Sequence, residues 1–479
     1  MVNFYQSKNS YGYPDFCLFI YSRESPNNWV KVFAGNNSEF EGLTMSRVNN
    51  TFLGAEPSWA NACVGENGNP TYVQYAMGFS QAANLLIDQV LNDDIKYAVD
   101  DFIYPVCFNM RHSVELRLKG AISELQKLGE VARIRLEFDL IGSHDIGRIW
   151  EFFQTQSEKF DSRYEALNQK IAPTILDIAA IDATGQTFRY PVSTESQKHL
   201  ADVGVISFFV LKERFNTLES HLDTLHKLNE FLVMEYKNRS FTKHLSRVQL
   251  FKIAKELPAI DEWSAEHFSV VRQSLKDKFG ISSRELSDAI NIIKGNYELA
   301  PLIGVTVNLH GISKDNLFSF ITHWLSLHVD AKDKTIAGTT ISSSDALGVF
   351  EHMVRSSEIK SNIWEDVSKW LTVEKLAGFQ ALFYFARDLD FSEQYTNTYE
   401  YLLLEAIAAQ RQPTSFRQNF MHLLDKTNCF SHMLQSLYFL KYDELAKQLI
   451  KHFDWNGVFE WQERAETREM FVLPLYSQY

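Results

Sequence analysis

Charged side chains are concentrated in one strongly apolar stretch of the chain, YPVCFNMRHSVELRLKGAI at 104–122. At about 100° per residue its apolar residues predict a broad buried helix face. Arg111 lies within this face and Glu115 lies at its edge. Burying such charges is costly unless they are paired, and a spacing of four residues places the two on one side of a helix. We therefore expect a polar site inside a helical core.

Further polar residues could complete this site. His112 and Lys119 lie just beyond the apolar face, and His144-Asp145 follows later in the chain. Arginine and lysine on one helix favour phosphate, which would make this a nucleotide-binding or RNA-binding site. The alternative is a structural polar network, in which His144-Asp145 caps the helix that carries Trp150 and bonds to the first helix.

A third interpretation is a metal site. His112 followed by His144-Asp145-Ile146-Gly147 resembles the metal-dependent phosphohydrolases of the HD type. That resemblance implies a divalent transition metal that activates water. The last ligand would come from one of three aspartates, Asp177, Asp182 or Asp202. The preferred interpretation assigns no metal ligand and no cofactor.

Composition and charge limit the classes of function. The chain has 479 residues, of which 45% are hydrophobic, and a net charge of −13. General disorder and a surface built for non-specific nucleic-acid binding are therefore excluded. The four cysteines, Cys17, Cys63, Cys107 and Cys429, have no metal-binding spacing. With no signal peptide and no apolar run near the roughly 20 residues that span a bilayer, we expect a cytoplasmic protein without a membrane partner.

The periodicity of the sequence predicts a mainly α fold. Residues 1–75 are the exception, a small β-containing region with strands over Phe16–Tyr21, Trp29–Phe33 and Leu43–Leu53 and a loop over Glu56–Pro70. A helical bundle is expected over 76–240, a helical connector over 241–305 and a C-terminal helical region over 306–479. We also expect a helix over Val131–Leu140, and a capping box formed by Ser282 and Glu285.

The stretch 75–240 resembles the HEPN superfamily of compact helical domains. The resemblance is carried by VELRLKGAI at 114–122, SHDIGRIW at 143–150 and FRYP at 188–191. It implies an all-helical, often dimeric bundle of the kind found in bacterial toxins, abortive-infection proteins and other defence factors. Arg189, within FRYP, joins the group of residues that bind substrate or form the polar network.

Active members of that superfamily are metal-independent ribonucleases with an Arg-x(4–6)-His motif at a dimer cleft. The resemblance implies that the RNA 2′-hydroxyl is the nucleophile, histidine the acid–base group and arginine the stabiliser of phosphate charge. Arg214 and His221 (RFNTLESH) match this spacing, as do Arg239 and His244 (RSFTKH). A third match, Arg417 with His422, lies outside the resembling stretch and is interpreted as a coincidence.

Two functions from different classes follow. The first is a bacterial defence effector that cleaves RNA without metal, or binds RNA or a nucleotide, as a homodimer or with a partner protein of a defence complex. Its expected catalytic residues are Arg214, His221, Arg239 and His244. The second is a non-catalytic helical scaffold in a defence complex, in which the bundle dimerises and the C-terminal helices bind a partner.

Overall fold

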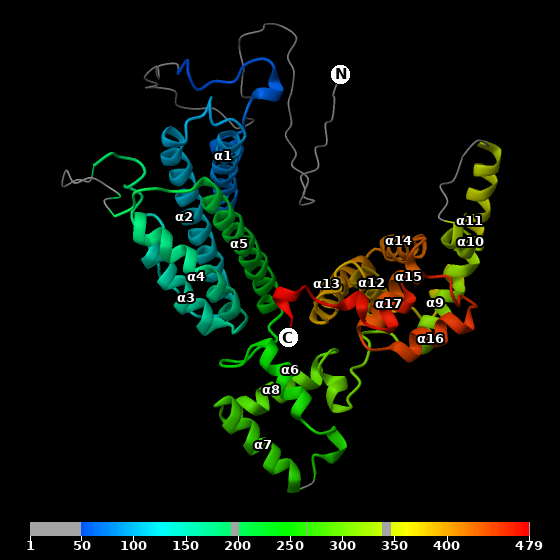
Figure 1. Ribbon diagram of the computed structural model, residues 1–479. Helices are drawn as coiled ribbons and strands as arrows, with labels where there is room; N and C mark the ends of the chain where they lie inside the picture. The colour runs from blue at the N-terminus through cyan, green and yellow to red at the C-terminus, as the bar shows by residue number, and fades with distance from the viewer. Residues whose placement is uncertain (1–48, 193–199, 201, 265, 338–345, 479) are drawn as a thin grey trace, which may run out of the picture. The chain divides into compact units, whose positions relative to one another are not determined.

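The computed structural model describes residues 49–192, 200, 202–264, 266–337 and 346–478 (Figure 1). The chain divides into two compact units, Met1–Asn69 and Pro70–Tyr479. In the first unit, the described residues form two short 3₁₀ turns, η1 (Ser58–Ala60) and η2 (Gly65–Asn67). This agrees with the loop expected over Glu56–Pro70.

The predicted β-containing region lies largely outside the described residues. The strands expected over Phe16–Tyr21 and Trp29–Phe33 fall there entirely, and the one over Leu43–Leu53 begins there. From residue 49 to residue 71, where the chain is described, no strand is present. The β-containing region therefore stays a prediction.

The second unit confirms the mainly α class. Over the described parts of Pro70–Tyr479 the structure has seventeen α-helices and no β-strand. None of the helices that could be searched combines the length and the apolar character required to cross a lipid bilayer.

Five long helices form the first part of this unit. They are α1 (Tyr72–Asn92), α2 (Val99–Ala132), α3 (Ile146–Phe160), α4 (Arg163–Asp182) and α5 (Phe208–Lys237). Helix α2 packs against α1, α3 and α5, and α4 packs against α3 and α5 (Figure 1). The five helices share one apolar core, which includes Val114 of α2, Ile149 of α3 and Leu225 of α5.

Local sequence explains how α1 begins and why it lies close to α2. Thr71 and Gln74 form a capping box: the Thr71 hydroxyl accepts from the Gln74 N–H at 3.3 Å, and the Gln74 side chain accepts from the Thr71 N–H at 2.8 Å. On α2, a Cβ at Gly120 would lie 3.1 Å from Cγ2 of Val73. The absence of a side chain at this position therefore permits the close approach of the two helices.

The helix expected over Val131–Leu140 is wrong. Helix α2 continues to Ala132, and Arg133 then takes a left-handed conformation with φ of 58°. The Ile134 N–H donates to the Gly129 carbonyl at 2.8 Å, which closes the helix end as C-terminal capping motifs do. A Cβ at Gly129 would lie only 2.6 Å from the Ile134 carbonyl oxygen, so this ending depends on glycine.

The middle of the unit contains α6 (Arg247–Glu256), η3 (Ile260–Glu262), α7 (Glu266–Phe279), α8 (Ser283–Gly295) and η4 (Ala300–Ile303). These elements pack around a second apolar core. Ser282 caps α8 by accepting from the Glu285 N–H at 3.2 Å. The capping box is nevertheless incomplete, because the Glu285 carboxylate accepts instead from the Thr242 hydroxyl and the His244 N–H, both at 2.7 Å.

The remaining helices pack around a third apolar core, with Phe379 and Phe383 of α12 fully buried in it. They are α9 (Lys314–Leu327), α10 (Ala331–Ala337), α11 (Ala346–Val367), α12 (Val373–Phe385), α13 (Glu393–Gln410), α14 (Pro413–Leu424), α15 (Cys429–Phe439), α16 (Asp443–His452), α17 (Gln462–Glu466) and η5 (Glu469–Phe471). The last turn, η6 (Leu475–Ser477), packs instead against α5, and its Tyr476 contacts the first apolar core. Helix α12 packs against α13 and α15.

Candidate functional site

Arg111 is buried at the centre of a polar network between three elements. Its guanidinium forms the expected ion pair with Glu115, one turn along α2. It also donates to the carbonyls of Asp182 at 3.2 Å, Ala183 at 2.8 Å and His144 at 2.5 Å. Arg111 therefore connects α2 to the end of α4 and to the segment before α3. These bonds use nearly all of its N–H donors.

Glu115 joins the other predicted residues to this network. Its Oε1 lies 2.9 Å from the Lys119 ammonium and 3.0 Å from Nδ1 of His144. Burial alone would raise the pKa of Glu115, but the bonds from Lys119 and His144 and the charge of Arg111 outweigh it and lower that pKa. The carboxylate is therefore held in its charged form.

A glycine beside Arg111 fits the network closely. Gly185 has φ of 80°, and a Cβ at this position would lie 3.0 Å from Nη1 of Arg111. Nearby, the Asp182 carboxylate accepts from the Thr187 N–H at 3.1 Å. The turn after α4 is therefore shaped around the guanidinium, which supports the structural interpretation of Arg111, Glu115 and Lys119.

His112 and Arg189 lie apart from the bonds of this network. The His112 ring makes an edge contact with Phe79 and stacks parallel to Phe108, with centroids 4.4 Å and 5.8 Å away. The Arg189 guanidinium lies 5.8 Å from the Phe108 ring and 5.4 Å from the Tyr190 ring. Burial lowers the pKa of His112, which favours its neutral form at pH 7. Its aromatic surroundings explain its position without a ligand.

The donors required by the metal interpretation have other partners. Nδ1 of His144 faces Glu115, and Asp145 caps α3 by accepting from the Arg148 N–H at 3.1 Å. Throughout the residues that could be searched, no group of three or more histidine, cysteine, aspartate or glutamate side chains is arranged to hold a metal ion. The HD-type alternative, with Asp177, Asp182 or Asp202 as the last ligand, therefore gains no support from the described geometry.

A cavity of about 470 Å³ lies between α2, α4, α5 and the segment before α5. Its wall is mostly apolar and includes Met110, Ile178 and Val210. The exposed side chains of Asp177 and Arg214 also line it, from α4 and α5. A small number of polar groups beside apolar walls is typical of a site for an organic molecule. We call it the α4/α5 cavity.

The two predicted Arg/His pairs have different surroundings. Arg214 and His221 both belong to α5, seven residues apart and therefore on nearly the same face of the helix. His221 is half-buried, and burial, together with the nearby Lys170, lowers its pKa. A neutral imidazole at pH 7 can accept a proton. Arg214 lines the α4/α5 cavity, whereas His221 does not line it and lies two turns further along nearly the same face of α5.

The second pair lies beyond the end of α5. Arg239 is exposed and takes a left-handed conformation with φ of 61°. The His244 N–H donates to Glu285, and its Nε2 lies 4.0 Å from the same carboxylate. His244 therefore faces a carboxylate of α8. The coincidental match, Arg417 with His422, belongs to α14.

Three other polar groups, buried or partly buried, are not apparent from the sequence. Arg163 binds Asp161 at 2.9 Å and Glu235 at 2.6 Å. The other two groups are Glu124 with His226 and Asn229, and Arg247 with Glu298 and Glu393. One signal was present: Glu235 continues the three-and-four spacing of the α5 leucines, where an apolar residue is expected.

Comparison with known proteins does not add an assignment. The chain matches no family model, no curated protein and no solved structure.

Proposed function

We propose that the protein is a bacterial defence effector with a HEPN-like bundle, which binds and cleaves RNA without metal through Arg214 and His221. The observation that carries this proposal is the position of the two side chains on nearly one face of α5, with Arg214 lining the α4/α5 cavity. RNA, or a nucleotide as the smaller ligand, is the proposed partner.

Each side chain has a chemical role in this proposal. The guanidinium of Arg214 binds a phosphate and stabilises the charge that develops on it. His221, whose lowered pKa favours the neutral imidazole at pH 7, takes the proton of the 2′-hydroxyl that attacks the adjacent phosphate. As the P–O2′ bond forms, the P–O5′ bond breaks, so that the products are a 2′,3′-cyclic phosphate and a 5′-hydroxyl that takes its proton from water. The apolar wall of the cavity accommodates an unstacked base, because bases bind well to apolar and aromatic surfaces.

The spacing of the pair favours a site made by two copies of the chain. Seven residues along a helix place the two Cα atoms about 10 Å apart, so one copy would supply the arginine and the other the histidine. Two exposed apolar side chains that line the same cavity as Arg214 fit a homodimer contact: Val205 and Val210 are 90% and 57% exposed. Exposed apolar patches of this kind are typical of protein interfaces.

Arg239 and His244 are the second choice for this chemistry. The imidazole of His244 faces the Glu285 carboxylate, 4.0 Å away, and the backbone N–H of His244 donates to the same carboxylate. A phosphate at this position would be repelled by that carboxylate. Variants of Arg239 and His244 therefore serve as controls for variants of Arg214 and His221.

A direct test of RNA binding uses fluorescence anisotropy with a labelled RNA in a chelating buffer. Arg214→Ala is expected to weaken binding about tenfold or more, the loss of one charged hydrogen bond. The control is Arg148→Ala, which removes an arginine that is 85% exposed on α3. If the two variants bind RNA as tightly as the unaltered protein, Arg214 does not contact RNA.

The non-catalytic scaffold is the second candidate, and one observation favours it. Helix α13 exposes Tyr401, Leu404 and Ile407, spaced three residues apart along the helix. A stripe of this kind could contact a partner protein. One experiment distinguishes the two candidates. If the protein is a scaffold, the unaltered protein should cleave no RNA in a chelating buffer.

A further inference from the structure

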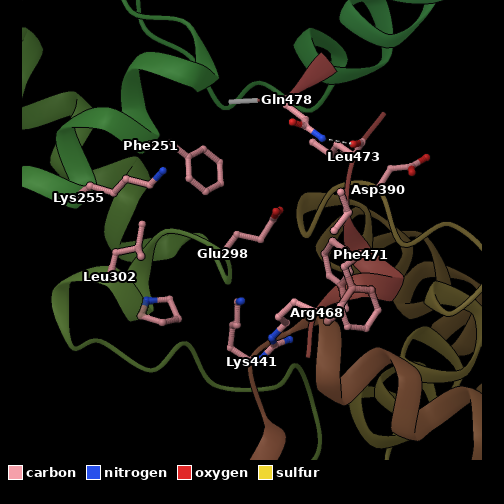
Figure 2. Close-up of a pocket in the computed structure, with 13 residues that line it drawn as sticks. Phe251, Lys255, Glu298, Leu302, Asp390, Lys441, Arg468, Phe471, Leu473 and Gln478 are labelled. Atoms are coloured by element: carbon pink, nitrogen blue, oxygen red, sulfur yellow. Dashed lines mark hydrogen bonds between the residues drawn. The ribbon is translucent and has the colours of Figure 1, made fainter. Parts of the chain in front are cut away.

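A second cavity lies far along the chain from the proposed RNA site. It has a volume of about 570 Å³, within the range of pockets that hold small molecules. One wall comes from α6 and the segment through η4, with Phe251, Lys255 and Leu302. The opposite wall comes from residues between Asp390 and Gln478 (Figure 2). We call it the α6/C-terminal cavity.

A buried polar junction beside this cavity holds its two walls together. Arg247 is 1% exposed, and its guanidinium pairs with Glu298 and with Glu393, the latter at 3.1 Å. Asn296 donates to Glu393 at 2.7 Å, and the Ser392 N–H donates to Glu298 at 2.9 Å. These bonds connect residues on both walls, so the cavity is formed before any ligand arrives.

The charges that line the cavity are not balanced. Glu298 is paired with Arg247, and Arg468 is paired with Asp443 through two contacts of 2.5 and 2.7 Å. By contrast, no described carboxylate forms an ion pair with Lys441 or Lys255. Asp390 is the remaining acidic group on the wall. The lining therefore has three cationic side chains, Lys255, Lys441 and Arg468, against two carboxylates, Glu298 and Asp390, an excess of one positive charge.

Lys441 is held in the cavity by an unusual backbone conformation. It follows α15 with φ of 67°, at a helix-end position where glycine is preferred. Figure 2 shows its side chain beside Arg468 and extending toward Glu298. Burial and the charge of Arg468 lower its pKa, against the opposing effects of the nearby Asp443 and Glu298. An ammonium crowded by another cation in this way would be stabilised by an anion.

Apolar side chains complete the lining. Phe251 and Leu302 lie on one wall, and Phe471 lies on the other with its ring 5.8 Å from the Arg468 guanidinium (Figure 2). A ligand that uses all of these groups must carry an anionic group and a flat or apolar body. A hydroxyl or amine on that body could donate to Asp390.

We infer that the α6/C-terminal cavity binds a mononucleotide, with its phosphate between Lys441 and Lys255 and its base against Phe251 and Leu302. This site is separate from the proposed RNA site and does not depend on it.

The test measures binding to the full-length protein by titration calorimetry, with AMP, adenosine and inorganic phosphate as separate probes. Saturable binding of AMP, with adenosine and phosphate each at least about tenfold weaker, is the expected result, because each probe lacks part of the contacts. If inorganic phosphate binds as tightly as AMP, the proposed contact between the base and the cavity wall is wrong. No saturable binding of AMP would overturn the site.

Three variants test whether AMP binds in the α6/C-terminal cavity. Lys441→Gly removes the ammonium and suits the left-handed backbone, so it is expected to fold and to bind AMP about ten- to a hundredfold more weakly. Leu302→Trp fills the cavity from a position that is 43% exposed and should also block AMP. Lys447→Ala, on α16, is the matched control, because Lys447 pairs with Glu444 and does not line the cavity. Unchanged AMP affinity in Lys441→Gly and Leu302→Trp would contradict the inference.

Discussion

Nδ1 of His144 lies 3.0 Å from Oε1 of Glu115, the carboxylate oxygen that also accepts from Lys119 at 2.9 Å. This contact joins the segment before α3 to the middle of α2. Together with Arg111 it makes the charged residues of the apolar stretch 104–122 a connection between helices. The residues proposed to act on RNA are on α5 instead.

Replacing Glu115 by glutamine should destabilise the protein strongly. The substitution preserves the shape of the side chain but leaves the buried charges of Arg111 and Lys119 unpaired, which typically costs ~3–5 kcal/mol. Urea denaturation measures the free energy of unfolding. Arg148→Ala, which removes an exposed arginine near Asp145, should change it by less than about 0.5 kcal/mol. Equal effects of the two variants would show that the network contributes little.

Replacing Gly185 by alanine should also lower stability. The new methyl group would meet Nη1 of Arg111 at 3.0 Å, and alanine is disfavoured at φ of 80°. A loss of ~1–3 kcal/mol in the free energy of unfolding is expected. Gly78 on α1 is the control, because a Cβ there meets nothing within 4 Å. Alanine at Gly78 should stabilise the helix, so a stabilising effect at both positions would contradict the account.

His226 should make stability depend on pH. Its Nδ1 lies 2.8 Å from a carboxylate oxygen of Glu124, and this contact raises the pKa of His226 above the usual 6.5. The stabilisation is therefore complete below about pH 6.5 and is lost as the pH rises through the higher folded-state pKa. His226→Gln should cost more stability at about pH 5.5 than at about pH 8.5. Denaturation curves at both values measure the difference.

His221, also on α5, should make stability depend on pH in the opposite direction. Burial lowers its pKa, so the folded protein disfavours protonation, and His221→Gln should relieve that penalty at low pH. The difference between the two variants should therefore grow as the pH falls. Parallel pH profiles for His221→Gln and His226→Gln would contradict both assignments.

The sequence predicted contacts that depend on local spacing. The pair of Arg111 and Glu115 follows from their separation of four residues, and Asp145 caps α3 as its place before an apolar run suggests. The mainly α class was predictable for the same reason, because helical periodicity is a local property. The failed helix over Val131–Leu140 shows the limit: apolar residues continue there, but Gly129 and the left-handed Arg133 end α2.

Contacts between distant segments could not be predicted in this way. Arg163 and Glu235 are 72 positions apart and meet only because α4 packs against α5. The aromatic surroundings of His112 likewise depend on how α1 approaches α2. Sequence spacing identified Arg214 and His221 as a pair, but the cavity beside Arg214 requires the three-dimensional arrangement of α2, α4 and α5.

The most direct test of the central claim is the rate of RNA cleavage in a chelating buffer. The unaltered protein should cleave a labelled RNA and leave the same RNA intact when its 2′-hydroxyls are methylated. His221→Ala should reduce the rate about 10²- to 10⁴-fold, the usual contribution of an acid–base group, whereas His244→Ala should preserve it. Full activity in His221→Ala, or loss of activity in His244→Ala alone, would contradict the assignment of the site to α5.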